Sequence, residues 1–224
     1  MPETLVDVRE ASRSYVLDGR EIAALERATC RVLPGDRIAL LGPSGSGKST
    51  LLHLMGGLDR PTSGAVTFPA LGEIDELRPS QLAFVFQAQS LLAPLTALEN
   101  VALPLVLDGM KESEAEFRAM RALERLGLEK VARQLPEELS GGQAQRVAVA
   151  RALAGSPKLI LADEPTGQLD SETGRHLMDT LLGALEHTKT ALVIATHDLA
   201  VARRMGLVWQ MRRGVLETGK RVSA

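Results

Sequence analysis

Cysteine is nearly absent from this chain, which has only Cys30 among its 224 residues. A single cysteine excludes a disulfide framework and a cysteine-rich zinc module. An excess of one sign of charge is also absent, because 26 Lys and Arg oppose 28 Asp and Glu and leave a net charge of −2. Such a chain lacks the electrostatic footprint of a non-specific nucleic-acid binder, so we expect no nucleic-acid partner. Any anion must therefore bind at a local site.

Long hydrophobic runs are missing as well. The longest stretch without charge, residues 79–98, contains two prolines and three glutamines, which makes it a poor membrane span. The first residues, MPETLVDVRE, lack the basic start and apolar centre of a signal peptide. We therefore expect that any role at a membrane needs a partner protein.

The composition is that of a globular protein, with 45% apolar and 24% charged residues. At about 150 residues per domain, the length fits one large domain or a core with an insertion. Apolar periodicity and turn signals predict strands near residues 4–9, 37–41, 64–68, 159–162, 191–195, 207–211 and 215–218, and helices over 48–55 and 171–185 and from residue 140. A further helix is expected to place Phe117, Met120, Leu123 and Leu126 on one face.

These elements predict one domain over residues 1–224. An α/β core of about 1–87 and 156–224 is interrupted by a helical insertion of about 88–155.

A glycine-rich segment between the strand at 37–41 and the helix at 48–55 matches the phosphate-binding P-loop pattern G-x-x-x-x-G-K-[ST]. Its glycines let backbone N–H groups point at phosphate oxygens, and the helix adds its positive N-terminus. Lys48 is expected to reach the β- and γ-phosphates, and the Ser49 hydroxyl to bind Mg²⁺. The alternative is a flexible loop. The predicted phosphate-binding residues are Gly42, Pro43, Ser44, Gly45, Ser46, Gly47, Lys48, Ser49 and Thr50.

An apolar strand at residues 159–162 leads into two carboxylates, Asp163 and Glu164. A buried strand delivers Asp163 to its carboxyl-terminal edge, where it can hold Mg²⁺. Glu164 points to a different side, toward an attacking water, and is the candidate general base. The alternative is the start of an ordinary loop.

Residues 139–143, Leu-Ser-Gly-Gly-Gln, resemble a second phosphate cradle: a serine that caps a helix, followed by two glycines. We expect Ser140, Gly141, Gly142 and Gln143 to contact the far side of a nucleotide. The alternative, a capped helix start, accounts for Ser140 but for neither glycine.

With this motif the sequence resembles the ATP-binding subunits of ABC transporters from about residue 5 to 215. The resemblance implies a P-loop NTPase core with a mainly parallel sheet, an N-terminal antiparallel β subdomain and an inserted α-helical subdomain. It implies that Tyr15 stacks on adenine, that Gln87 contacts Mg²⁺ and senses a membrane partner, that Asp170 lies in the loop crossing a dimer interface, and that His197 is the switch histidine. Each could instead be structural: Tyr15 a packed strand aromatic, Gln87 a polar strand end, His197 a core histidine.

Within this family, the sequence is similar to that of the subunits serving macrolide exporters, lipoprotein-releasing complexes and the cell-division ABC pair. The similarity lies in segments 42–52, 57–64, 95–101 and 162–167. The chain differs from the usual sequence of this group at several positions. Ala144 and Gln168 replace a usual glutamine and asparagine, Arg213-Gly214 replaces a common Asp-Gly turn, and residues 69–81 form a shorter segment than usual. None removes a group needed for hydrolysis.

The resemblance implies an ATP-sandwich homodimer in which each ATP lies between one chain's P-loop and the other's Ser140–Gln143. Glu164 is then the base, His197 organises water, and Lys48 with Mg²⁺ stabilises charge. The implied partner is an integral membrane permease of the FtsX-like type, at the cytoplasmic face of the membrane, moving an amphiphilic substrate. A regulatory ATPase that controls an extracytoplasmic hydrolase and a soluble ABC-type ATPase are the alternatives.

The apolar segment 88–95 follows Gln87 directly and is a candidate docking site for the membrane subunit. The alternative is that Leu91 and Leu92 belong to the core.

Overall fold

The computed structural model describes residues 3–73, 79–87 and 90–219. The chain divides into two compact units. The first comprises Met1–Leu77, Lys158–Glu164 and Lys189–Ala224, and the second comprises Arg78–Pro157 and Pro165–Thr188. In the described part of the chain, no helix is both long enough and apolar enough to cross a membrane. The predicted single domain with boundaries at 87/88 and 155/156 stays a prediction.

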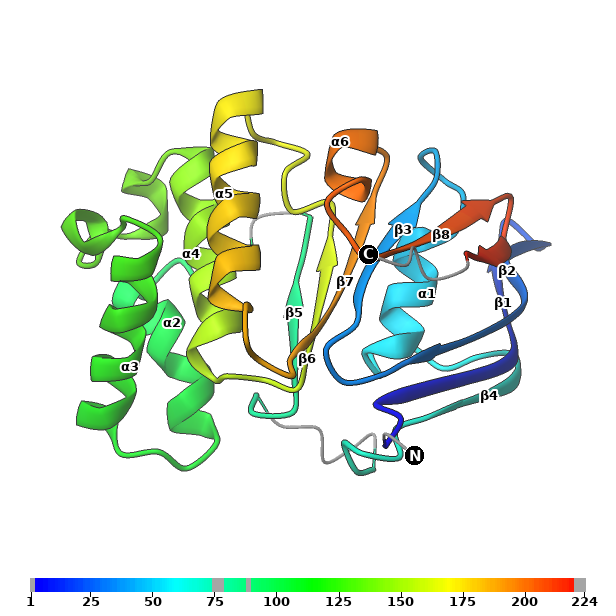
Figure 1. The fold of residues 1–224 in the computed structure, drawn as a ribbon, viewed down its shortest axis with the longest axis horizontal. Coiled ribbons are helices and arrows are strands. Elements are labelled where there is room, and N and C mark those ends of the chain that lie inside the picture. Colours follow the sequence, from blue (N-terminus) through cyan, green and yellow to red (C-terminus); the bar gives the residue numbers. More distant parts are fainter. Residues whose placement is uncertain (1–2, 74–78, 88–89, 220–224) are drawn as a thin grey trace. The chain divides into compact units, whose positions relative to one another are not determined.

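The first unit is built on a sheet with the strand order β4-β1-β2-β9-β8-β3-β7-β6 (Figure 1). Strands β8, β3, β7 and β6 run parallel, whereas β1 pairs antiparallel with β2 and β4. The strands are β1 (Val6–Leu17), β2 (Arg20–Val32), β3 (Arg37–Leu41), β4 (Ser63–Thr67), β6 (Leu159–Asp163), β7 (Ala191–Thr196), β8 (Leu207–Arg212) and β9 (Val215–Thr218). The α/β fold with a parallel core therefore follows the predicted pattern.

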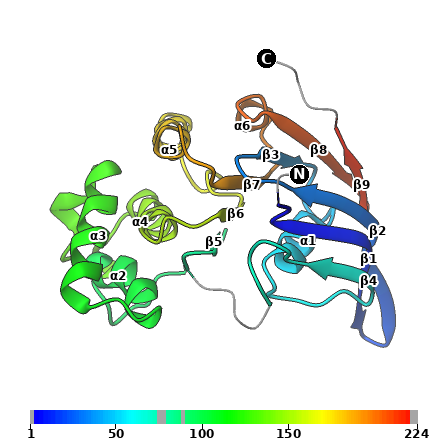
Figure 2. The same cartoon turned by 60° about the horizontal axis from the view of Figure 1, so that its bottom comes forward.

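Two helices flank this sheet. Helix α1 (Lys48–Met55) contacts β6 and β7, and the short helix α6 (Leu199–Ala202) contacts β3 and β7. Figure 2 shows them on opposite faces of the sheet. The central strands are buried along their whole length because both faces are covered, so they read as continuous apolar runs in the sequence.

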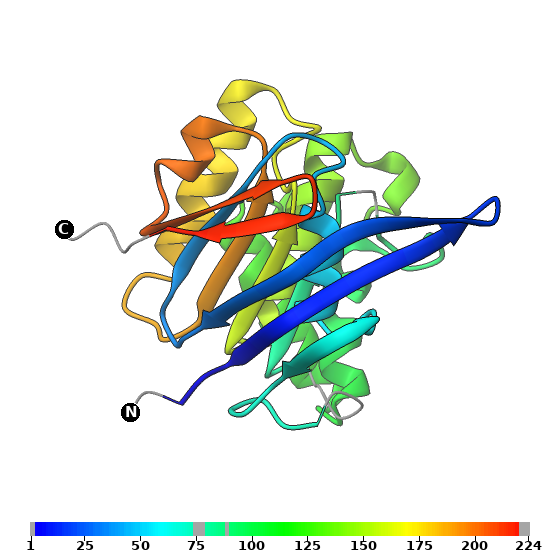
Figure 3. The same cartoon turned by 90° about the vertical axis from the view of Figure 1, so that its right-hand side faces the viewer.

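Strands β1 and β2 form a hairpin much longer than the strand expected at residues 4–9 (Figure 3). The residue pattern predicted no strand at β2, although the antiparallel pairing agrees with the β subdomain that the family resemblance implied. The pairing register shifts between Val8 and Ala11, and Glu10 and Arg27 both have positive φ. Such bulges break the two-residue alternation by which a strand is recognised. The far half of the hairpin is also exposed, so it carries no buried stripe.

The second unit is mostly helical. It contains β5 (Leu82–Val85), α2 (Ala97–Leu107), α3 (Glu112–Arg125), two 3₁₀ turns (Glu129–Val131 and Pro136–Glu138), α4 (Gly141–Ala154) and α5 (Ser171–Ala184). Helices α2, α3 and α4 contact one another, and α4 also contacts α5 and β5. Eight of the fourteen residues of α4 are buried and five of these are alanine, which lets neighbouring elements approach its backbone closely.

The prediction of which side chains form the buried face of α3 is wrong in part. Phe117 is 67% exposed, and the buried residues of α3 are Ala115, Ala119, Ala122 and Leu123. A step of three residues falls about 60° short of a full helical turn, so three such steps carry the side chain to the opposite side. Phe117 and Leu126 therefore cannot share one face, although Leu126 itself is buried.

Asn100 holds the segment that leads into α2. Its side chain is fully buried; the amide nitrogen donates to the carbonyls of Leu92, Leu95 and Thr96, and the amide oxygen accepts from the Leu92 N–H at 2.7 Å. Thr96 caps the same helix in a reciprocal capping box with Glu99. The connecting segment is thus fixed by one buried amide.

We predict that Asn100→Ala lowers the free energy of unfolding by about 2 kcal/mol, because it leaves buried carbonyls without donors. Urea unfolding followed by circular dichroism measures the change. Glu116→Ala, an exposed position on α3, is the control and should change stability by less than about 0.5 kcal/mol. Equal stability of the two variants would contradict the role assigned to Asn100.

Candidate functional site

The P-loop connects β3 to α1, as predicted, and neighbouring backbone fixes its path. A Cβ on Gly42 would lie 2.3 Å from the Met211 carbonyl oxygen, and one on Gly47 would lie 2.4 Å from the Ala24 carbonyl oxygen. Gly47 also has a φ of 102°. No residue with a side chain fits at either place, so strands β8 and β2 confine the loop from outside. Because Gly47 is the N-cap of α1, no side chain caps the N–H groups at that helix start.

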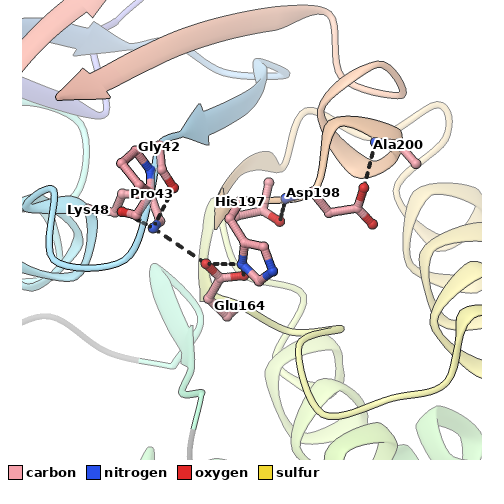
Figure 4. A network of polar contacts seen from close by, with 8 residues as sticks. Gly42, Pro43, Lys48, Glu164, His197, Asp198 and Ala200 are labelled. Carbon is pink, nitrogen blue, oxygen red and sulfur yellow. Dashed lines mark hydrogen bonds and ion pairs between the residues drawn. The ribbon is translucent and has the colours of Figure 1, made fainter.

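Lys48 is folded back over the loop that it follows. Its Nζ donates to the carbonyl oxygens of Gly42 at 2.9 Å and Pro43 at 3.1 Å, and it lies 3.4 Å from Glu164 Oε1 (Figure 4). Both charged side chains are buried. The lysine charge of the P-loop therefore faces the loop interior and the carboxylate of Glu164, the residue that follows β6.

Glu164 and His197 follow the adjacent parallel strands β6 and β7, whose carboxyl ends meet at one edge of the sheet. His197 Nδ1 lies 3.1 Å from both carboxylate oxygens of Glu164. Glu164 has a φ of 46° and its N–H donates to the Ala195 carbonyl at 2.9 Å. A left-handed conformation at a residue with a side chain costs energy and is commonest at functional sites.

Two residues beside His197, which the sequence analysis did not single out, fix the backbone around it. The Asp198 N–H donates to Thr196 Oγ1 at 3.0 Å, and the Asp198 carboxylate accepts from the Ala200 N–H at 2.7 Å as the N-cap of α6. An aspartate just before a helical pattern is an N-cap signal that the sequence contained. The histidine ring itself is largely exposed, so it can reach a ligand at the sheet edge.

A cavity of about 440 Å³ borders the same edge of the first unit. The start of the P-loop and His197 both line it, together with Leu199 and Arg212. The cavity places the histidine and the loop around one space.

Asp163 ends β6 and has a buried carboxylate whose Oδ1 has no hydrogen-bond partner among the described residues. A buried carboxylate oxygen without a donor is unfavourable unless a cation binds it. No group of three or more His, Cys, Asp or Glu that could hold a metal occurs in the described ranges. The orphaned oxygen of Asp163 fits Mg²⁺, which typically takes one or two carboxylates and completes its shell with hydroxyl, water and phosphate oxygens. Ser49, in the first turn of α1, has such a hydroxyl.

The second unit carries the motif at 139–143. Ser140 caps α4 by accepting from the Gln143 N–H at 3.2 Å, and Gln143 Oε1 accepts from the Ser140 N–H at 2.8 Å. Both side chains thus have a local structural role, and the one for Gln143 was not expected. A Cβ on Gly141 would meet nothing within 4 Å, so packing within the described chain does not require this glycine.

Asp170, also in the second unit, is the N-cap of α5. Its carboxylate accepts from Thr173 N at 2.9 Å and Thr173 Oγ1 at 2.6 Å, and these hydrogen bonds hold the pKa of Asp170 below its usual value. Asp170 thus has a local structural role at the start of α5. Gln87 is exposed just after β5, and residues 88 and 89 beside it, like 74–78 of the shortened segment, lie outside the described residues.

The structure therefore brings together Lys48, Asp163, Glu164 and His197 around the P-loop in the first unit, which also carries Tyr15 on β1. Gln87, the 140–143 motif and Asp170 belong to the second unit.

Comparison with known proteins identifies the family model "ABC transporter" over residues 25–167. The lipoprotein-releasing system ATP-binding protein LolD of Legionella pneumophila (strain Paris) is 45% identical over 226 residues, covering 96% of this chain and 98% of that protein. LolD of Pseudomonas fluorescens is 42% identical over 221 residues, covering 96% and 97%.

Among solved structures, the dimeric ATP-binding cassette MJ0796 in a post-hydrolysis state with ADP and Pi has a TM-score of 0.89 at 39% identity, covering 98% of this chain and 99% of that one. CbiO1 from Clostridium perfringens has a TM-score of 0.82 at 30% identity, covering 97% and 88%. These matches confirm the predicted fold class and the resemblance on which it rested.

We predict that Lys48→Ala weakens binding of MgATP at least tenfold, because it removes the one lysine charge on the P-loop. Fluorescence titration measures the affinity. Lys158→Ala is the control, since Lys158 Nζ donates instead to the Ala70 carbonyl at 3.0 Å. Unchanged affinity of the Lys48 variant would remove Lys48 from the nucleotide site.

Proposed function

The chain belongs to the ABC transporter family as an ATP-binding, ATP-hydrolysing subunit, and on that basis we propose that it drives a separate membrane permease in the release of an amphiphilic, lipoprotein-like substrate. The observation that carries the proposal is the 45% identity to a lipoprotein-releasing ATP-binding protein over 96% of this chain. The permease would be of the FtsX-like type, and the chain would lie at the cytoplasmic face of the membrane through that permease.

ATP would bind with its phosphates in the P-loop, from Gly42 to Thr50, and its base near Tyr15. Lys48 would exchange its hydrogen bonds to the carbonyls of Gly42 and Pro43 for hydrogen bonds to the β- and γ-phosphates, because a charged donor binds phosphate oxygens more strongly than neutral carbonyls. Mg²⁺ would be held by Ser49, Asp163 and Gln87, and would neutralise developing negative charge on the transferred phosphoryl group.

When Lys48 binds the phosphates, its ion pair with Glu164 would break. The Glu164 carboxylate would then accept a proton from the attacking water. His197, already 3.1 Å from both carboxylate oxygens, would orient that water and contact the γ-phosphate. Glu164 is buried, and its backbone N–H donates to the Ala195 carbonyl, so the main chain that carries the carboxylate is fixed.

A second copy of the chain would complete each site through Ser140, Gly141, Gly142 and Gln143, with Asp170 in the loop that crosses the interface. The open space at Gly141 supports this, because backbone N–H groups there can approach a phosphate without a side chain in between. The dimeric form of the solved relatives supports it as well.

We predict that Glu164→Gln binds ATP but hydrolyses it at least about 100-fold more slowly, because glutamine cannot accept the proton. ATP then accumulates unhydrolysed and favours the dimer by mass action. Size-exclusion chromatography with MgATP and a phosphate-release assay measure both effects. Exposed Glu186→Gln is the matched control. Full turnover by the Glu164 variant would overturn its assignment as the base.

The candidate docking segment gives another test. Leu92 is 46% exposed, which contradicts the alternative that it is a core residue, whereas Leu91 is half-buried. The Leu92 backbone, not its side chain, bonds to Asn100. We predict that Leu92→Asp leaves basal ATPase activity within about twofold while it reduces co-purification with the membrane subunit, because a charge would enter an apolar contact.

Gln87→Ala should do the reverse, with slower hydrolysis and intact docking. Leu17→Asp, at the exposed end of β1, is the matched control for a charged residue replacing an exposed leucine. A folded Leu92→Asp variant that co-purifies fully would remove this segment from the coupling interface.

A further inference from the structure

Two charged side chains hold the ring of Tyr15, the only tyrosine in the chain. The guanidinium carbon of Arg13 lies over the ring, 4.6 Å from its centroid. The Tyr15 hydroxyl donates to Asp59 Oδ2 at 2.9 Å, and Arg13 Nε donates to the same oxygen at 2.8 Å. One carboxylate oxygen thus fixes both the ring and the cation above it.

This arrangement gives the ring two unequal faces. The guanidinium covers one face, while Tyr15 as a whole remains 38% exposed. Burial alone would raise the pKa of Asp59, but hydrogen bonds from the Arg60 N–H, Tyr15 and Arg13 outweigh it and the pKa lies below its usual value. Asp59 is therefore ionised at neutral pH and keeps the arginine in place.

The Tyr15 ring is connected to the P-loop through strand β2 and, by way of Asp59, through helix α1. Tyr15 pairs with Ile22 across the hairpin, and two residues further along β2 the Ala24 carbonyl abuts Gly47 of the P-loop. Asp59 lies just beyond the end of α1, the helix that begins at Lys48. The platform and the phosphate loop are thus parts of one compact unit.

We propose that Arg13 and Asp59 are positioning residues that hold Tyr15 as a one-sided platform for the purine base of ATP. This inference rests on the proposed function. A base stacks on an aromatic face because both are flat and polarisable. A cation on the opposite face draws electron density from the ring, which reduces repulsion between the two π systems. The fixed hydroxyl lowers the cost of ordering the ring when the base binds.

The test uses nuclear magnetic resonance of the full chain with ¹³C-labelled tyrosine rings, which gives one ring spin system because there is one tyrosine. MgATP and inorganic tripolyphosphate are titrated separately. In the unmodified protein we expect ATP, but not tripolyphosphate, to shift the ring signals upfield. Arg13→Gln should weaken ATP binding about twofold to fivefold and leave tripolyphosphate binding unchanged.

Arg9→Gln is the matched control, because Arg9 lies on the same strand and donates to Asp7 at 2.8 Å but contacts no aromatic ring among the residues that the structure describes. Arg13→Lys, which keeps the charge, should recover part of the lost affinity. Asp59→Asn provides a second, milder variant should Arg13→Gln fold poorly by circular dichroism, and its effect should again be confined to ATP.

The outcomes separate this inference from the proposed function. If Arg13→Gln and Asp59→Asn leave ATP affinity unchanged, weaken both ligands equally, or match Arg9→Gln, the positioning role is overturned while the P-loop assignment stands. If the unmodified protein binds neither ATP nor tripolyphosphate, the proposed function fails, and this inference fails with it.

Discussion

The ion pair between Lys48 and Glu164 is the constraint around which the first unit is organised. The two atoms lie 3.4 Å apart and both side chains are buried. Removing one partner of a buried pair typically costs about 3–5 kcal/mol, since a charge remains without water or a counter-charge. The P-loop lysine and the carboxylate after β6 therefore stabilise one another in the interior of the first unit. His197 Nδ1 lies 3.1 Å from the same carboxylate, so Glu164 has a second neighbour that can stabilise it.

The parallel strands explain why these groups meet. Strands β3, β6 and β7 are neighbours that run in the same direction, so the residues after each of them gather at one edge. Gly42 follows β3, Glu164 follows β6 and His197 follows β7. Residues far apart in sequence thus meet at one sheet edge, while the backbone of the long hairpin β1–β2 reaches the P-loop at Gly47 through the Ala24 carbonyl.

Much of this core could be predicted from the sequence. Helix α1 and strands β3 and β9 have the predicted bounds, and β6 and β7 differ by one residue at their ends, because apolar runs bounded by turn signals are strong local patterns. The extent of the hairpin β1–β2 could not be predicted from the residue pattern, since bulges at Glu10 and Arg27 interrupt its alternation, and only the family resemblance implied an antiparallel β subdomain. The buried face of α3 differs from the predicted one because alanines, rather than the larger apolar side chains, make most of its packing contacts. For the site, the motifs gave the residue types, but the local capping by Gln143 and Asp170 depends on side-chain geometry that a motif does not specify.

The close approach of backbone to Gly42 and Gly47 has a consequence for how such a sequence can evolve. At both positions a Cβ would collide with a main-chain oxygen, Met211 O or Ala24 O, and a main-chain oxygen cannot be trimmed by mutating its residue. A substitution at either glycine therefore has no single-residue suppressor in the opposing strand. By contrast, the loop's Ser44 is exposed and can drift whenever activity is not under selection. A duplicated copy that has lost its catalysis would keep these two glycines for as long as it keeps its fold, so their presence alone records ancestry and architecture rather than turnover.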